Sequence, residues 1–367
     1  MKKKLTISLF VGVVISAAAL YLAFRNVPLD DLAEYLSSID LVWVLPSVFM
    51  VVICFGLRAL RWQIIVSSAR KISFWQSFHP LMIGFMINCI LPGRVGEVAR
   101  PAILQKNEKI AFTTGLATVA AERVFDIFVL IVLFIALIAS IQIDPDINYV
   151  VGSYQLNLAT LEIIFKSMVS MGLILIAGII MVSIQATRNL IIRTIKFIPS
   201  FFFFLGPKFK IKISQKLCEP LIRIVENIAL GFELIKYPKK IFICLLYSCL
   251  IWGLQAFSYY MMALGSPGIN LTFAEMATVM VIVCFFIALP SVPGFWGIWE
   301  AGGVFALSLF GVSTQDAAGY TLANHAVQMF PVIFIGFVSA VLSSVNILQV
   351  TYKKKQPGVP ETGVQPR

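Results

Sequence analysis

Residues 88–101 have the sequence NCILPGRVGEVARP, in which charged side chains crowd around a Pro-Gly pair. The charges are Arg94, Glu97 and Arg100, and the segment directly follows an apolar run over residues 74–91. The chain has 367 residues, of which 59% are hydrophobic and only 13% charged, and its mean hydropathy is +0.91. Soluble domains are roughly half apolar. The composition therefore indicates a polytopic membrane protein, and a charged break at this place needs an explanation.

Apolar runs recur along the chain, and about 20 helical residues are enough to span the hydrocarbon core of a bilayer. A shorter run covers residues 302–312, and the longer ones cover residues 5–24, 41–57, 74–91, 111–141, 164–184, 241–264, 273–292 and 317–347. The first run follows three lysines, so a cleaved signal peptide is the alternative to a retained helix. Its length favours the retained helix.

Basic residues between the runs predict the orientation, because cytoplasmic loops are enriched in Lys and Arg. The net charge is +11, and the basic residues behind it lie between the apolar runs. This placement favours a membrane-topology signal over nucleic-acid binding. The rule places the acidic segments 30–40 and 144–146 outside, and it places inside the segments 2–4, 58–71, 186–240 and 353–355. We therefore expect a multi-pass protein of the cell (cytoplasmic) membrane with both termini in the cytoplasm.

The orientation leaves one apolar run too many in each half. Two runs, 74–91 and 111–141, lie between an inside and an outside segment, so one of them does not cross. The second half also has one apolar run too many between the inside segment that ends at Lys240 and the inside segment 353–355. We therefore expect an all-α fold of about six spanning helices plus two re-entrant hairpins. The predicted units are a first half over 1–160, a second half over 161–348 with the basic loop 186–240, and a disordered tail over 349–367.

Each predicted hairpin contains the pattern P-G-x-x-G. It comprises Pro92, Gly93 and Gly96 in the first half and Pro293, Gly294 and Gly297 in the second. Gly/Pro-interrupted apolar segments at matching positions of oppositely oriented halves are typical of inverted-repeat transporters, whose binding sites lie at these breaks. Ordinary helix-to-loop exits are the alternative, because Pro and Gly also end helices.

The segments NCILPGRVGEVARPAIL, AERVFDIFVL and LPSVPGFWGIWEAGG resemble the lysylphosphatidylglycerol synthetase transmembrane-region family, a group of flippase-like integral membrane proteins. The resemblance covers roughly residues 5–347 and implies a lipid-translocating membrane domain. We expect a stand-alone form without the soluble aminoacyltransferase domain that some relatives carry, because the chain ends soon after its last apolar run. Lipid aminoacylation is therefore not expected.

The resemblance also implies which residues matter. The matching positions are Asn88, Pro92, Gly93, Gly96, Glu97, Arg100, Glu122, Arg123, Asp126, Pro293, Gly294, Gly297 and Glu300. The family commonly has a glycine and an arginine where this chain has Phe295 and Trp299, and many relatives have an arginine near His325. An outer site for an anionic headgroup has therefore lost two cationic positions.

The residues allow a functional and a structural interpretation. Glu122 and Asp126 are four apart and share a helix face beside Arg123. Guanidinium groups suit phosphate because they stay charged and bind it bidentately. A salt-bridged staple that packs the hairpin on the long helix is the alternative, and both stay open. Arg58 and Arg61 are expected to be interface anchors, and His325 a packed polar group beside Pro331 in preference to a proton shuttle.

The resulting prediction is an ATP-independent flippase or transporter that moves a (phospho)lipid headgroup, anionic or lipid-linked, through a polar groove at the hairpin tips. No nucleotide-binding or zinc motif occurs, so no cofactor, metal or catalytic residue is expected. Alternatives are an intramembrane enzyme acting on a lipid-linked substrate and a non-catalytic membrane partner of a lipid or glycan synthase. The candidate substrate-binding residues are Asn88, Arg94, Glu97, Arg100, Glu122, Arg123, Asp126, Glu300 and His325.

Overall fold

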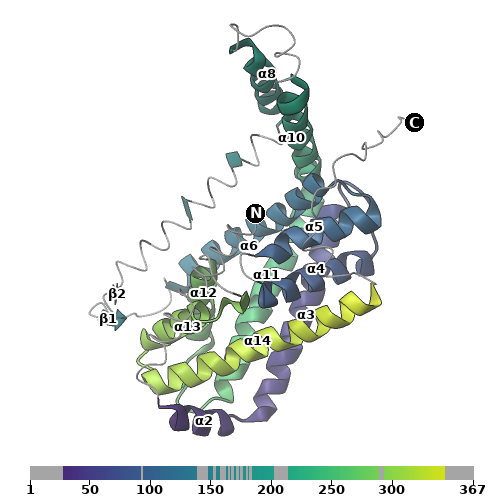
Figure 1. Ribbon diagram of the computed structural model, residues 1–367. Helices are drawn as coiled ribbons and strands as arrows, with labels where there is room; N and C mark the ends of the chain where they lie inside the picture. Colours follow the sequence, from purple (N-terminus) through teal and green to yellow (C-terminus); the bar gives the residue numbers. More distant parts are fainter. Residues whose placement is uncertain are drawn as a thin grey trace.

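The computed structural model describes residues 28–91, 94–138, 148–151, 154–157, 184–201, 214–288 and 293–343, with scattered positions between 163 and 181. Over these residues the chain is predominantly helical (Figure 1). The first apolar run and the tail over 349–367 lie outside the described residues. The choice between a signal peptide and a retained helix therefore stays a prediction.

The described elements fall into two groups of helices and a segment between them. The first group is α2 (Leu29–Ser37), α3 (Leu41–Val66), α4 (Phe74–Ile90), α5 (Val95–Glu108) and α6 (Phe112–Ile138). Between the groups lie β1 (Asn148–Val151), β2 (Tyr154–Asn157), α8 (Gln185–Phe201), the π-helix η1 (Ser214–Cys218), α10 (Glu219–Gly231) and η2 (Glu233–Lys236). The last group is α11 (Pro238–Leu264), α12 (Phe273–Ala288), η3 (Pro293–Phe295), α13 (Ile298–Ser308) and α14 (Thr314–Leu342). The two strands pair antiparallel, with Asn148 opposite Asn157.

Three of the described helices, α3, α11 and α14, are long and apolar enough to cross a membrane. Helix α6 is as long as α11, at 27 residues, but it carries Glu122, Arg123 and Asp126 near its middle. Helix α12 is apolar but has only 16 residues. The helical membrane class is confirmed, whereas the number of crossings and the re-entrant path stay predictions.

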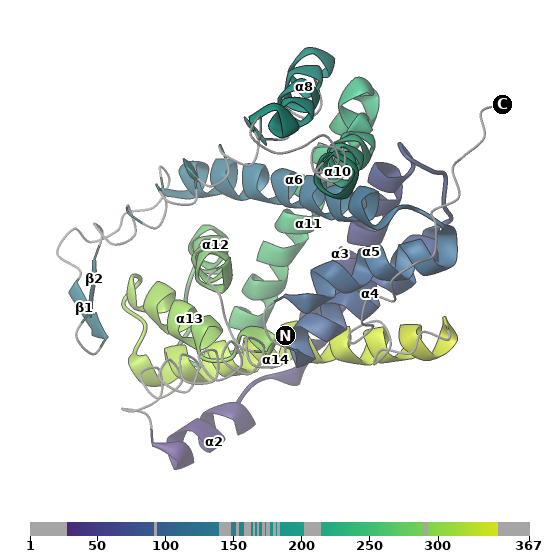
Figure 2. The same cartoon turned by 45° about the horizontal axis from the view of Figure 1, so that its top comes forward.

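The order long, short, short, long occurs twice, as α3 to α6 and as α11 to α14. The contacts between helices repeat with it: α4 packs on α14 as α12 packs on α6, and α5 packs on α6 as α13 packs on α14 (Figure 2). Helices α3 and α11 lie together at the centre. They run antiparallel, since Ser47 contacts Ser258 while Arg61 contacts Ser248. Helices α8 and α10 project from this bundle (Figure 1).

The two P-G-x-x-G motifs have the same backbone conformation at their third position. Arg94 has φ 54° and Phe295 has φ 61°, a left-handed conformation that few side chains adopt. Gly294 and Gly297 also have positive φ, at 66° and 85°. Pro92 and Gly93 lie outside the described residues. Each motif therefore joins two packed short helices, α4 to α5 and α12 to α13.

Glycine allows α4 and α5 to touch. A Cβ atom on Gly96 would lie 1.8 Å from the carbonyl oxygen of Gly84. Arg94 makes no side-chain cap, and the Asn88 side chain instead accepts a hydrogen bond of 2.7 Å from the Gly96 N–H. Asn88, a predicted substrate ligand, therefore caps the start of α5.

We predict that Gly96→Ala destabilises the protein by about 1–3 kcal/mol, because α4 and α5 must separate to admit the methyl group. Gly253→Ala is the matched control: Gly253 lies in α11 with nothing within 4 Å of the place that a methyl group would take, so alanine should be neutral or stabilise by about 0.5–1 kcal/mol. Thermal unfolding in detergent measures both. Equal midpoints for the two variants would contradict the close packing.

Candidate functional site

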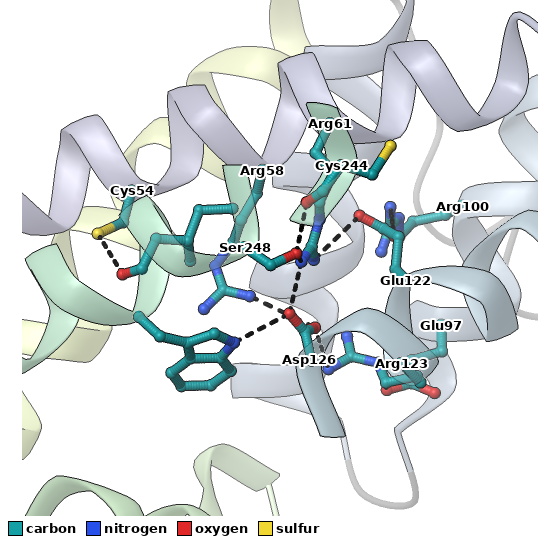
Figure 3. Close-up of polar contacts among 12 residues, drawn as sticks. Cys54, Arg58, Arg61, Glu97, Arg100, Glu122, Arg123, Asp126, Cys244 and Ser248 are labelled. Carbon is teal, nitrogen blue, oxygen red and sulfur yellow. Dashed lines mark hydrogen bonds and ion pairs between the residues drawn. The ribbon is translucent and has the colours of Figure 1, made fainter. Parts of the chain in front are cut away.

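Charged side chains from three helices meet between α3, α5 and α6 (Figure 3). Their shared feature is a guanidinium or carboxylate group directed toward the same interior region. We name this group the arginine cluster, and its members are Arg58, Arg61, Glu97, Arg100, Glu122, Arg123 and Asp126.

Asp126 is the most connected carboxylate of the arginine cluster. Its Oδ1 accepts hydrogen bonds from Arg61 Nη1 at 2.7 Å and from the indole N–H of Trp252 at 3.1 Å. Its Oδ2 lies 3.8 Å from Arg58 Nη1 and 3.6 Å from Arg123 Nη1. Three cations thus share this buried carboxylate.

Glu122 pairs one helical turn away from Asp126. Its Oε2 accepts a hydrogen bond of 2.5 Å from Arg100 Nη2, and its Oε1 lies 3.7 Å from Arg61 Nη2. The Arg100 guanidinium also lies 4.1 Å from the centre of the Trp62 ring, a cation–π distance. Arg61 therefore bridges the two carboxylates of α6, and Arg100 joins α5 to α3 and α6.

The cluster becomes more exposed toward the first hairpin tip. Glu97 Oε1 lies 3.4 Å from Arg123 Nε and 3.7 Å from Arg94 Nη1. The side chains of Arg94, Glu97 and Arg123 are 37%, 24% and 27% exposed, whereas those of the inner members are at most 9% exposed. Arg94, Glu97 and Arg123 thus form an accessible mouth that continues into a buried interior.

Positive charge is in excess at this place. Among the residues that the structure describes, the mouth and the interior together hold five arginines against three carboxylates. The buried Nε atoms of Arg58, Arg61 and Arg100 have no hydrogen-bond partner, and that of Arg123 has only the ion-pair contact with Glu97. A buried polar atom without a partner costs free energy. An anion that entered the mouth would find unused donors and uncompensated positive charge.

The interpretation of Arg58 and Arg61 as interface anchors is wrong. They are 8% and 1% exposed, and both contact Asp126. The physical reason is pairing: two carboxylates four residues apart on α6 need cations from a neighbouring helix. An arginine pair at i and i+3 on an apolar helix was a usable signal for that contact.

The second hairpin tip contains a separate polar group. His325 Nδ1 lies 2.6 Å from Glu300 Oε1, and its Nε2 lies 2.8 Å from the carbonyl oxygen of Gly294. The other carboxylate oxygen, Oε2 of Glu300, accepts the N–H of Gly297 at 2.6 Å. The Trp299 ring stacks on His325 at 4.5 Å with an interplanar angle of 2°. His325 is therefore a packed polar group, held between Glu300, the Gly294 carbonyl and the Trp299 ring.

The two tips touch each other. Arg94 Nη2 donates to the carbonyl oxygen of Ile287 at 2.7 Å, and η3 packs on α4. A cavity of about 140 Å³ lies beside this contact, with Arg58 on its wall together with His325 and Trp299. Trp252, Gln255 and Gln328 also line it, and sequence reasoning missed all three because single polar or aromatic residues in apolar helices carry no spacing signal.

The predicted site residues therefore divide into groups. One network contains Arg94, Glu97, Arg100, Glu122, Arg123 and Asp126. Glu300 and His325 pair at the other tip. Asn88 caps a helix. Among the described residues, no group of three or more His, Cys, Asp or Glu side chains is arranged to hold a metal ion.

We predict that Asp126→Asn destabilises the protein by about 3–5 kcal/mol, because three buried arginines lose a shared partner. Glu97→Gln removes the same charge at the exposed mouth and should cost less than about 1 kcal/mol. Unfolding midpoints of both variants in detergent give the comparison. A similar loss for the two would show that depth within the network has no influence.

The chain is similar in sequence to known proteins, which include one longer protein and two UPF0104 membrane proteins. The chain is 23% identical over 363 residues to Glycosyltransferase AglD of Haloferax volcanii, covering 92% of this chain and 54% of that protein. It thus spans about half the length of AglD. It is 20% identical to a UPF0104 membrane protein of Pyrococcus horikoshii, covering 79% and 84%, and 22% identical to one of Methanocaldococcus jannaschii, covering 73% and 99%.

The family model of the lysylphosphatidylglycerol synthase TM region matches residues 9–336. This range contains the arginine cluster and both hairpin tips. The match is the family expected from the P-G-x-x-G segments. The chain therefore belongs to the lysylphosphatidylglycerol synthase TM region family.

Proposed function

We propose that this protein moves a lipid headgroup between the two leaflets of the cell membrane without ATP. The observation that carries the proposal is the chain of ion pairs from the partly exposed Arg94, Glu97 and Arg123 to the buried Asp126, beside the contact between the two hairpin tips. A charge at the bilayer centre costs roughly 2.5–3.5 kcal/mol on insertion scales, so such a cluster is kept for a functional reason.

The chemistry of the mouth suits an anionic headgroup. Arginine presents a planar fork of N–H donors that matches the oxygens of a phosphate. Arg94 and Arg123 both pair with Glu97, and Arg123 also shares Asp126 with Arg58 and Arg61, so these arginines outnumber the carboxylates that they contact. A phospholipid or lipid-linked phosphate would therefore exchange its water shell for guanidinium groups.

Helix α14 has one face toward the central cavity, where polar residues lie, and another face toward an apolar groove. His325, Gln328 and Met329 face the central cavity. Val327 and Phe330 instead line an apolar groove of about 650 Å³ against α3. In the proposed mechanism the headgroup passes on the cavity side while the acyl chains stay in contact with the groove and the lipid.

Movement of the tips is part of the proposal. The cavity of about 140 Å³ has room for only a few water molecules, at roughly 30 Å³ each, so a headgroup needs the tips to separate. The left-handed residues Arg94 and Phe295 lie where the backbone would bend. The repeated helix order supports hairpins that enter from opposite sides, with cytoplasmic termini and alternating access.

The match to AglD supports a second candidate. A region similar to this chain makes up about half of a protein named as a glycosyltransferase, so the chain could act as the membrane partner of a separate glycan or lipid synthase. Copurification of a stoichiometric synthase would favour this candidate. A covalent change in lipids incubated with the pure protein would instead favour an intramembrane enzyme.

We predict that Arg123→Gln slows lipid movement more than about tenfold, because loss of a charged contact costs 2–5 kcal/mol. Arg223→Gln in α10 is the matched control, since its side chain is 63% exposed and lies outside the arginine cluster. The assay uses vesicles with fluorescent phosphatidylglycerol in both leaflets and follows the fraction that dithionite reaches.

The outcome depends on wild type as well as on the variants. Wild-type protein should expose the inner-leaflet probe that stays protected in empty vesicles. Equal rates for wild type and Arg123→Gln would contradict a role for the mouth. Protection equal to empty vesicles, also with extracted native lipids, would contradict lipid movement.

A further inference from the structure

The Glu300–His325 pair is separate from the arginine cluster and is fully buried beside the second hairpin tip. Glu300 is 0% exposed and His325 is 1% exposed. The pair joins α13 to α14, and the Gly294 carbonyl joins the hairpin tip to the same imidazole. A buried acid and base at 2.6 Å, beside a cavity, must hold a proton in a defined way.

The contacts fix how many protons the pair holds. The Gly294 carbonyl oxygen can only accept, so His325 Nε2 carries a proton. The contact between Nδ1 and Glu300 Oε1 needs one further proton on either atom, because two lone pairs at this distance repel. With that proton the pair is neutral overall. Without it, a buried carboxylate faces a lone pair, and the hydrogen bond between Glu300 and His325 is lost.

Few other ionisable groups line the cavity beside His325. The titratable or charged groups that line the cavity with His325 come from four helices: Arg58 of α3, Cys89 of α4, Tyr259 of α11 and Cys284 of α12. Of these four described groups, Arg58 alone carries a permanent charge. Water in the cavity would connect His325 to this arginine and hence to the arginine cluster.

The same pair holds the tip in place. Glu300 Oε2 accepts the Gly297 N–H, and His325 bonds Gly294 at the start of the tip, both at backbone positions with positive φ. The pair therefore holds the tip to α14 through His325 and to α13 through Glu300.

We propose that the Glu300–His325 pair is a proton-binding site and that one proton accompanies each anionic lipid across the membrane. This inference rests on the proposed function. The proton enters the pair from cavity water, occupies the Nδ1–Oε1 contact, and leaves to water when the tip detaches from α14. A monoanionic lipid and a proton that cross together carry no net charge.

The test uses vesicles with a trace of fluorescent phosphatidylglycerol, an imposed pH difference, and potassium with valinomycin to hold the voltage at zero. One proton per lipid predicts about a tenfold difference in probe between leaflets for each pH unit. Protein-free vesicles give the response of the probe itself. Complete mixing without accumulation by wild type would overturn proton coupling and leave lipid movement intact, whereas no movement at all would contradict the proposed function.

Variants locate the proton site. His325→Arg retains a cation that cannot lose its proton, and Glu300→Gln removes the acid, so neither should accumulate the probe. His79→Gln is the matched control, because it replaces the other of the two histidines and should accumulate the probe like wild type. Accumulation by His325→Arg equal to wild type would overturn the inference.

A second measurement is independent of transport. In the His79→Gln protein, ¹⁵N-labelled imidazole reports His325 alone. Spectra are recorded over a series of pH values, and we expect the Nδ1 resonance to change along it while Nε2 stays protonated. Resonances that do not change over this range would overturn the assignment of an exchangeable proton, whatever the transport assay shows.

Discussion

Asp126 accepts from Arg61 and Trp252 while Arg58 and Arg123 lie within ion-pair distance, and this shared carboxylate joins α3, α6 and α11. Each buried ion costs several kcal/mol to remove from water, so the helices that carry these charges must come together. The same need places Arg100 against Glu122 and thereby docks α5 on α6. The first hairpin is positioned by charge pairing as much as by apolar packing.

The charges of the cluster are unequal: in the described part of the chain its mouth and interior contain five arginines and three carboxylates. The buried Nε atoms of Arg58, Arg61 and Arg100 have no hydrogen-bond partner. The proposed lipid movement uses this excess of positive charge. The second tip differs, because it holds an aromatic stack of Trp299 on His325 and the Glu300–His325 pair. The two halves thus share a helix order but have different chemistry.

Sequence reasoning predicted the helical membrane class, the family and the breaks at both P-G-x-x-G motifs, because glycine, proline and hydropathy act locally. It also brought Glu122 and Asp126 to one helix face. It could not predict the ion-pair partners of Arg58 and Arg61, because these partners are distant in sequence. The nearby basic residues suggested the membrane interface instead. Asn88 was similarly ambiguous: an amide can bind a headgroup or cap a helix, and only the approach of Gly96 decides.

The path of the hairpins through the membrane is the premise on which lipid movement depends. It is tested most directly by the sidedness of single cysteines, placed in a background without the six native ones, at the exposed positions Lys71, Lys109, Thr272 and Ser313. Lys71 and Lys109 flank the first hairpin, and Thr272 and Ser313 flank the second. Re-entrant hairpins predict that an impermeant thiol reagent labels the first pair only from the cytoplasm and the second pair only from outside. Labelling of either pair from opposite sides would show that its hairpin crosses the membrane, and would contradict two tips that meet from opposite faces.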